Sequence, residues 1–214
     1  GSTIAIGYAA LSAYTHAENS FNVAIGTQTA YLKTSGRFNT YIGGYKVADA
    51  DLTGQYNAYF GSYTNQYGTA TSNTTLIGYQ AGRYASGSSN TFVGSEAGKG
   101  GTTSAPYSSG INNTAVGYQA LDAFTTGYQN VVVGNSAGGA INTGYTNTFM
   151  GYLAGANITT GHANVIIGRA AGYASTDVDS VVIIGEQAAY TGNMTSDADG
   201  TVSIGANAGK NITS

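Results

Sequence analysis

The sequence predicts an all-β fold: a parallel β-solenoid of about twelve coils, each of about 17 residues. Two observations carry this prediction, namely a glycine that recurs at a nearly constant interval and an apolar residue that always precedes it. The recurring glycines are Gly7, Gly26, Gly43, Gly61, Gly78, Gly94, Gly117, Gly134, Gly151, Gly168, Gly185 and Gly205. Six of the eleven intervals are 17 residues, and four of these follow one another between Gly117 and Gly185. A fixed period of this length indicates stacked units that each contact only their neighbours.

Each repeat reads T-G-x-x-N-T-x-ϕ-G-x-x-A-G, where ϕ is apolar. The ϕ residues are Ile6, Ile25, Ile42, Phe60, Ile77, Val93, Val116, Val133, Met150, Ile167, Ile184 and Ile204. The T-G-x-x-N segment is typical of a turn, because glycine adopts positive φ and asparagine bonds local backbone or tolerates the left-handed region. The residues before the glycine are β-branched or aromatic, which favours a strand. A coil of this length leaves room for two short strands and two turns.

Composition narrows the class of protein. Glycine supplies 33 of 214 residues without a three-residue period, which excludes collagen. A charged fraction of 8% together with 42% hydrophobic residues argues against a disordered linker. A net charge of −3 lacks the positive charge that proteins use to bind nucleic acid. No apolar run is long enough to span a membrane, and the lack of cysteine agrees with an extracellular fibre. We interpret residues 1–2 as a cloning scar and residues 3–214 as one solenoid domain, a fragment of a longer fibre.

The strand that precedes each glycine is apolar on both faces. Successive side chains of a strand point to opposite faces, and eleven of the twelve residues two places before the glycine are also apolar or aromatic. They are Ala5, Ala24, Tyr41, Tyr59, Leu76, Phe92, Ala115, Val132, Phe149, Ile166, Ile183 and Ser203. One face fills the interior of the coil, so the other needs a partner. Closed rotational symmetry between identical chains would supply it.

Four consecutive repeats carry a resemblance to known families. They are NTAVGYQAL (113–121), NVVVGNSAG (130–138), NTFMGYLAG (147–155) and NVIIGRAAG (164–172). They resemble head-domain repeats of trimeric autotransporter adhesins and the T-T-G-x-x-N-T-A-I-G-Y-x-A repeats of phage tail-fibre-like proteins, from Thr3 to Gly209. The resemblance implies a left-handed β-roll, a homotrimeric fibre, and attachment at a cell surface or on a virion tail fibre. Adhesin-head coils are typically shorter than 17 residues, and serine-rich turns stand there in place of T-G-x-x-N.

The residues that catalysis would need are scarce. His16 and His162 lie in predicted turns without an accompanying nucleophile, and no phosphate-binding loop or zinc motif occurs. The acidic pairs Asp49/Asp51, Asp177/Asp179 and Asp197/Asp199 lack the third carboxylate of a calcium loop, so we interpret them as solvated turn residues. The sequence therefore predicts no enzyme, cofactor or bound metal.

Ligand contact is expected in turns and in the places where the interval between anchor glycines lengthens. The chain has 18 tyrosines, and those in turns face solvent. Insertions lie near residues 99–110 and 191–200, and insertions in repeat proteins form surface loops. The candidate contact residues are Tyr56, Tyr107, Tyr128, Tyr145, Lys99, Asn193, Asp197 and Asp199.

The function that these observations predict is a structural and adhesive fibre segment, which attaches to a cell-surface glycan or an envelope component of a host or prey cell. A passive shaft, whose recognition domain lies elsewhere, is the first alternative. An ice-binding solenoid is a remote one, because Thr75, Thr91, Thr114 and Thr148 form a rank but aromatic and valine neighbours break the second threonine column.

Overall fold

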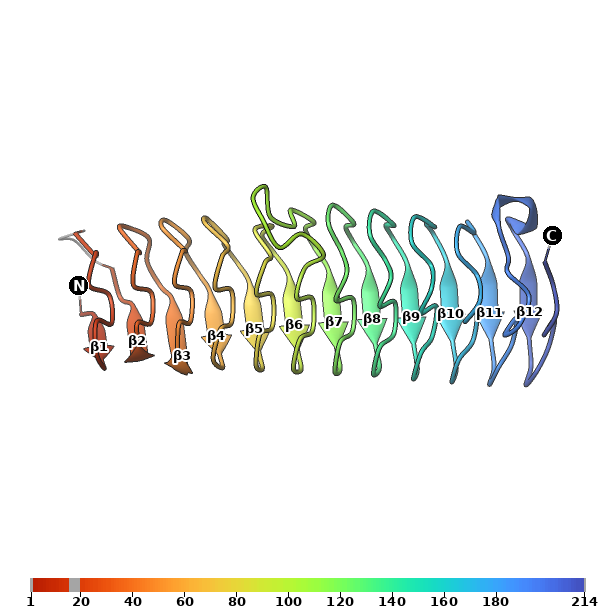
Figure 1. Cartoon of the computed structure of the whole chain (residues 1–214), viewed down its shortest axis with the longest axis horizontal. Coiled ribbons are helices and arrows are strands. Elements are labelled where there is room, and N and C mark those ends of the chain that lie inside the picture. The colour runs from red at the N-terminus through yellow and green to blue at the C-terminus, as the bar shows by residue number, and fades with distance from the viewer. Residues whose placement is uncertain (1, 16–19, 214) are drawn as a thin grey trace.

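In the computed structural model the chain forms one parallel sheet of twelve strands in the order of the sequence (Figure 1). The structure describes residues 2–15 and 20–213. The strands are β1 (Ile4–Ile6), β2 (Val23–Thr27), β3 (Thr40–Tyr45), β4 (Ala58–Phe60), β5 (Thr75–Ile77), β6 (Thr91–Val93), β7 (Thr114–Val116), β8 (Val131–Val133), β9 (Thr148–Met150), β10 (Val165–Ile167), β11 (Val182–Ile184) and β12 (Val202–Ile204). The described residues contain no α-helix and a single 3-10 turn, η1 (Ser196–Ala198). This confirms the predicted parallel β-solenoid of about twelve coils.

Within the described residues each coil contains one strand, not two as expected from its length. The stretch after the anchor glycine alternates between positive and ordinary φ, as at Gln119 (φ 53°) and Leu121 (φ 55°). This alternation points successive amides in opposite directions. Gln119 donates back to the carbonyl of Ser95, and Leu121 donates forward to that of Ala137. The stretch is therefore bonded to both neighbouring coils without forming a regular strand.

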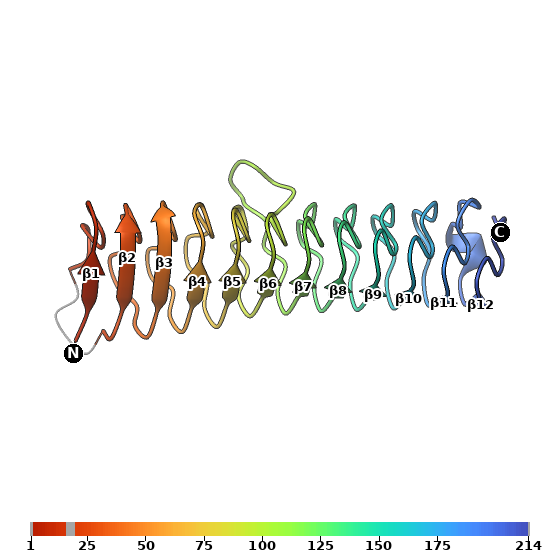
Figure 2. The same ribbon diagram turned by 90° about the horizontal axis from the view of Figure 1, so that it is seen from below.

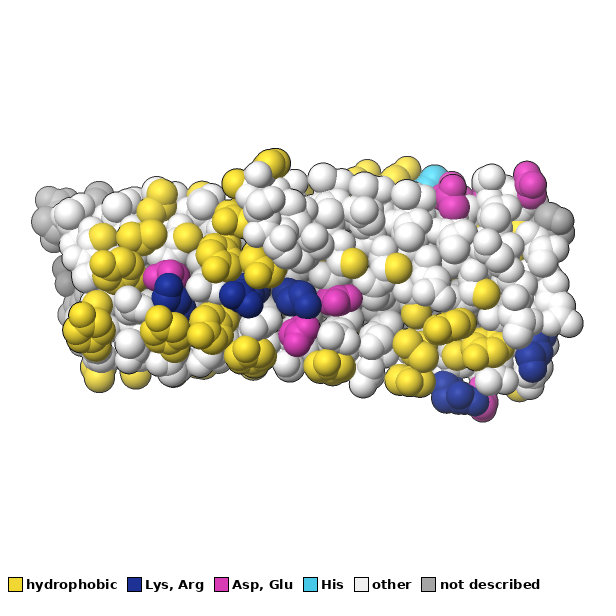
Figure 3. Space-filling view, in the orientation of Figure 1, with side chains coloured by type: hydrophobic (Ala, Val, Ile, Leu, Met, Phe, Trp, Pro, Cys, Tyr) yellow, Lys and Arg dark blue, Asp and Glu magenta, His cyan; other side chains and the backbone are white. Residues whose placement is uncertain are grey.

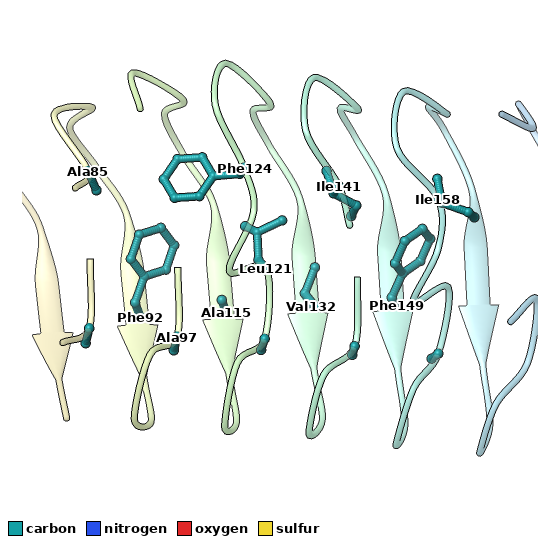
Figure 4. Packing of buried hydrophobic residues seen from close by; sticks show 14 of the residues in the cluster. Ala85, Phe92, Ala97, Ala115, Leu121, Phe124, Val132, Ile141, Phe149 and Ile158 are labelled. Atoms are coloured by element: carbon teal, nitrogen blue, oxygen red, sulfur yellow. The ribbon is translucent and has the colours of Figure 1, made fainter. Parts of the chain in front are cut away.

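The register places equivalent residues side by side along the whole solenoid. In β8 to β10, for example, Val132 pairs with Phe149, and Phe149 pairs with Ile166. From β2 to β11 the second residue of each strand is completely buried, and it forms the inner column of the core (Figure 4). A second buried column consists of the repeat alanines, such as Ala137 and Ala154.

Small and large residues alternate between facing positions of this narrow interior. Opposite the large Phe149 stands Gly155, where a Cβ atom would lie 2.6 Å from the ring and φ is +56°. In the coil of β7, the small Ala115 is matched by Leu121 at the equivalent position (Figure 4). This complementarity keeps the interior filled although each coil encloses little volume.

The repeat asparagines form a buried ladder. Asn130 donates from Nδ2 to the Gly144 carbonyl (2.9 Å) and to Oδ1 of Asn113 (3.0 Å). Its own Oδ1 accepts from the backbone N–H of Asn147 (3.0 Å). The predicted local bond to the turn backbone is made by Asn90, which donates to the Gly87 carbonyl (3.0 Å), whereas side chains such as that of Asn130 bond the preceding and following coils. The residue that adopts positive φ is the one before the asparagine, such as Gln129 (φ 56°).

One of the two predicted insertions lies in the middle of the solenoid and the other near its C-terminal end (Figure 1). Between β6 and β7, residues 99–110 form a loop that projects beyond the other coils (Figures 1 and 2). The base of this loop is attached by a parallel bridge between Ser108 and Ala85. Between β11 and β12, residues 191–200 contain η1.

The ϕ residues lie on the outer face of the sheet, beside the first residue of each strand. Several are well exposed although they are large and apolar: Ile6, Phe60, Ile77, Val116, Met150 and Ile204. The single chain therefore buries one apolar face of its strands and presents the other as a stripe along its length.

Candidate interaction surface

Tyrosine side chains gather around Arg83. The residues involved belong mainly to the segments that come directly after the anchor glycines Gly61 and Gly78. The Arg83 guanidinium carbon lies 5.3 Å from the ring centroid of Tyr63, 5.6 Å from that of Tyr67 and 5.1 Å from that of Tyr84. The rings of Tyr67 and Tyr84 are parallel at 5.2 Å, and Tyr107 of the long loop stacks on both. We name these five residues the tyrosine–arginine patch. Such contacts between a guanidinium and ring faces are attractive, so they order the patch.

Charged side chains continue this surface on both sides (Figure 3). Lys99 Nζ lies 2.8 Å from Glu96 Oε2 and 4.0 Å from Asp122 Oδ2. The hydrogen bond from Lys99 holds the pKa of Glu96 below its usual range. Tyr84 donates its backbone N–H to the Lys99 carbonyl. The predicted contact residues Tyr107 and Lys99 therefore lie on one surface, which spans several coils.

A different edge carries Tyr128 and Tyr145. Their rings are parallel at 4.9 Å, and the ring of His162 stacks on Tyr145 at 4.6 Å. His162 Nδ1 lies 2.8 Å from Asp179 Oδ1. Asp199 Oδ1 in turn accepts from the Asp179 backbone N–H at 2.7 Å. The edge thus changes from aromatic to acidic along the solenoid, and it brings Tyr128, Tyr145 and Asp199 into one line.

The other predicted contact residues are separate. Tyr56 ends a stack with Phe38 and Phe21 on a third line. Asn193 Oδ1 accepts from the Thr176 hydroxyl of the preceding coil at 3.0 Å. Asp197 lies in η1 and is exposed. His16 lies outside the described residues.

Stacking between neighbouring coils limits what these aromatic rings can bind. Tyr145 has Tyr128 on one face and His162 on the other, so both of its faces are covered. In the patch, Tyr67 and Tyr84 cover one another. A sugar stacks on an open ring face, whereas these rings present edges and hydroxyl groups. The surface is therefore better suited to contacts through its hydroxyl groups and its arginine than to stacking of a sugar between aromatic rings of neighbouring coils.

The interior holds a charged group that the repeat pattern did not indicate. Asp51 was predicted to be a solvated turn residue, but its side chain is completely buried and faces the buried ammonium of Lys33 at 3.6 Å. The reason is its place in the coil, because equivalent positions hold the buried Phe124 and Ile141. Aligning the coils after the anchor glycine would have revealed two charges in a column whose other buried members, such as Phe124, Ile141 and Ser175, are uncharged.

Within the described part of the chain, no three histidine, cysteine or acidic residues come together as metal ligands. Among those same residues, no helix has the length and apolar character to cross a membrane. The fold and this surface define the chain as a parallel β-solenoid repeat protein. Comparison with protein-family models, with curated proteins and with solved structures finds no match for it.

Proposed function

We propose that the chain is a segment of a surface-displayed adhesive fibre, an adhesin or tail-fibre-like protein without enzymatic activity. In this proposal three copies associate side by side, with left-handed coils, outside a cell or on a virion tail. The observation that carries it is the exposed apolar stripe of ϕ residues, which runs from Ile6 to Ile204 on the outer face of one continuous sheet. Such a stripe on a single chain favours association, and the resemblance of the repeats to trimeric fibres suggests the number three.

We expect the protein to have about three times the 21.6 kDa mass of one chain in solution, and to lose this state when the stripe is charged. The test variant is the double substitution Ile77→Lys and Met150→Lys, which places two cations in each copy of the contact. Light scattering at micromolar concentration measures the mass. Ile111→Lys is the matched control, because Ile111 is equally exposed (44% against 41% for Ile77) but lies outside the stripe. A stable single-chain species of the unaltered protein would contradict the proposal.

Adhesion is assigned to the tyrosine–arginine patch, because a cation among amphipathic rings suits the polar and anionic groups of an envelope surface. Arg83→Ala is expected to weaken binding to whole cells or arrayed glycans about tenfold or more, since a small loss at each site is multiplied across the copies of a fibre. The control is Arg169→Ala. Arg169 is exposed and pairs with Glu186 away from the patch, so its loss should leave binding unchanged.

A passive shaft is the second candidate, and the covered ring faces of Tyr145 and its neighbours favour it. The same assay separates the two functions. If the unaltered protein binds no cell or glycan, the segment acts as a spacer and the patch only stiffens the surface.

A further inference from the structure

Two opposite charges occupy the interior between the coils of β2 and β3. Lys33 and Asp51 stand at the same position of successive coils, and the side chains of both are fully buried. Later coils place Phe124, Ile141 and Ile158 there, also fully buried. Replacing a buried ion pair by apolar residues of similar size is often neutral or stabilising, so packing alone does not explain the pair.

The surroundings of Asp51 polarise its carboxyl group in a defined way. The backbone N–H of Gly54 donates to Oδ1 (2.9 Å), and the Tyr41 hydroxyl donates to Oδ2 (2.7 Å). Lys33 Nζ lies 3.6 Å from Oδ2 and donates to the Gly54 carbonyl (2.7 Å). The amine is therefore held beside the carboxyl group while it donates a hydrogen bond to the Gly54 carbonyl.

Burial favours the uncharged forms of both groups. It lowers the pKa of Lys33 and raises that of Asp51, although the charge of each partner opposes the shift. Burial also raises the pKa of Tyr41 well above its usual range, so its hydroxyl remains protonated as a donor. A neutral amine is a nucleophile and a neutral carboxylic acid can be attacked, whereas the ion pair is unreactive.

We propose that Lys33 Nζ and the side-chain carboxyl carbon of Asp51 condense into an amide bond that joins the two coils covalently. The ammonium first gives a proton to the carboxylate. The amine then attacks the carboxyl carbon, and the Gly54 N–H stabilises the negative charge that develops on Oδ1. Tyr41 gives its proton to Oδ2 and takes one from the attacking nitrogen. Oδ2 leaves as one water molecule with the acid hydrogen and one amine hydrogen, so no oxidant or reductant is needed.

The fold supplies the driving force for this condensation. Two groups held in one geometry react as if at very high concentration, and the dry interior expels the water that forms. The product is a neutral amide in place of a buried ion pair, which removes the cost of keeping two charges out of water.

Intact-mass spectrometry of the denatured, unaltered protein tests the proposal. The expected mass is that of the sequence less one water molecule, and the absence of cysteine excludes disulfides as a cause of lower mass. Trypsin should then fail to cleave after Lys33, and it should release residues 1–37 joined to residues 47–83. This readout does not depend on any variant folding.

Three variants complete the test. Lys33→Arg keeps the positive charge but should restore the full mass, whereas Tyr41→Phe should slow the loss of water and leave a mixture. Lys46→Arg is the control. Lys46 Nζ lies 3.4 Å from Asp49 Oδ2 near the surface, so this variant should still show the loss of one water molecule relative to the mass of its own sequence. The sequence Asp199–Gly200 can also lose water by cyclisation, but that loss maps to peptide 170–210. The full sequence mass, or a loss confined to peptide 170–210, would overturn the proposal.

Discussion

Replacing Gly134 by alanine is expected to lower the free energy of unfolding by about 3–5 kcal/mol, or to prevent folding of the central coils. Gly134 has a φ of +140°, in a region that residues with a side chain avoid. A Cβ atom there would lie 2.3 Å from the carbonyl oxygen of Gly151 in the next coil. Because that oxygen belongs to backbone bonded to its neighbours, it has no low-energy way to move. Chemical denaturation followed by circular dichroism, at fixed protein concentration, measures the change.

Gly139→Ala is the matched control for this prediction. Gly139 lies in the same coil, but the nearest atoms to its added Cβ are at 3.5 Å, an ordinary contact distance. We expect its effect to be below about 1 kcal/mol. Equal destabilisation by the two substitutions would contradict the prediction, because the positive φ and the close approach of the next coil at Gly134 would then add no cost beyond that of a methyl group at Gly139.

The periodicity of the sequence was sufficient to predict the solenoid, because every coil repeats the same strand in the same register. It also revealed that both strand faces are apolar. It did not reveal that each coil has only one strand, since alternating positive φ values at Gln119 and Leu121 involve residues other than glycine. The signals for a positive φ at such residues are weak, and here bonding to neighbouring coils imposes the conformation.

The surface was harder to predict than the fold. Tyrosines in turns were expected to face solvent, but whether the face of a ring is free to bind depends on its neighbours in adjacent coils. Tyr128 and Tyr145 align because their coils have equal length, whereas Tyr107 reaches Tyr67 and Tyr84 only through the inserted loop. The burial of Asp51 likewise depends on its position within the coil, which the residue types of its turn do not reveal.

Asn130→Ala is expected to cost about 3–4 kcal/mol of unfolding free energy, because it leaves buried polar groups without partners. The substitution removes the acceptor of the Asn147 N–H and the donor to the Gly144 carbonyl. Asn130 is fully buried, so water does not replace these bonds in the folded chain. Each unsatisfied buried group costs about 1–3 kcal/mol, and the loss of the side chain adds a small cavity. The midpoint of chemical denaturation measures the effect.

The ladder itself supplies an internal comparison for this prediction. Thr74 and Val181 occupy the asparagine position in two coils, and each backbone N–H still donates to the asparagine of the preceding coil. The ladder can therefore end at a residue other than asparagine. Asn130 differs because it is an interior member, bonded to the coils before and after it. Asn142→Ala is the control, since Asn142 is exposed and its side chain accepts a bond from Thr125 at the surface. If both alanine variants unfold at the same denaturant concentration, the buried ladder does not hold the coils together, and stability must come from the apolar column alone.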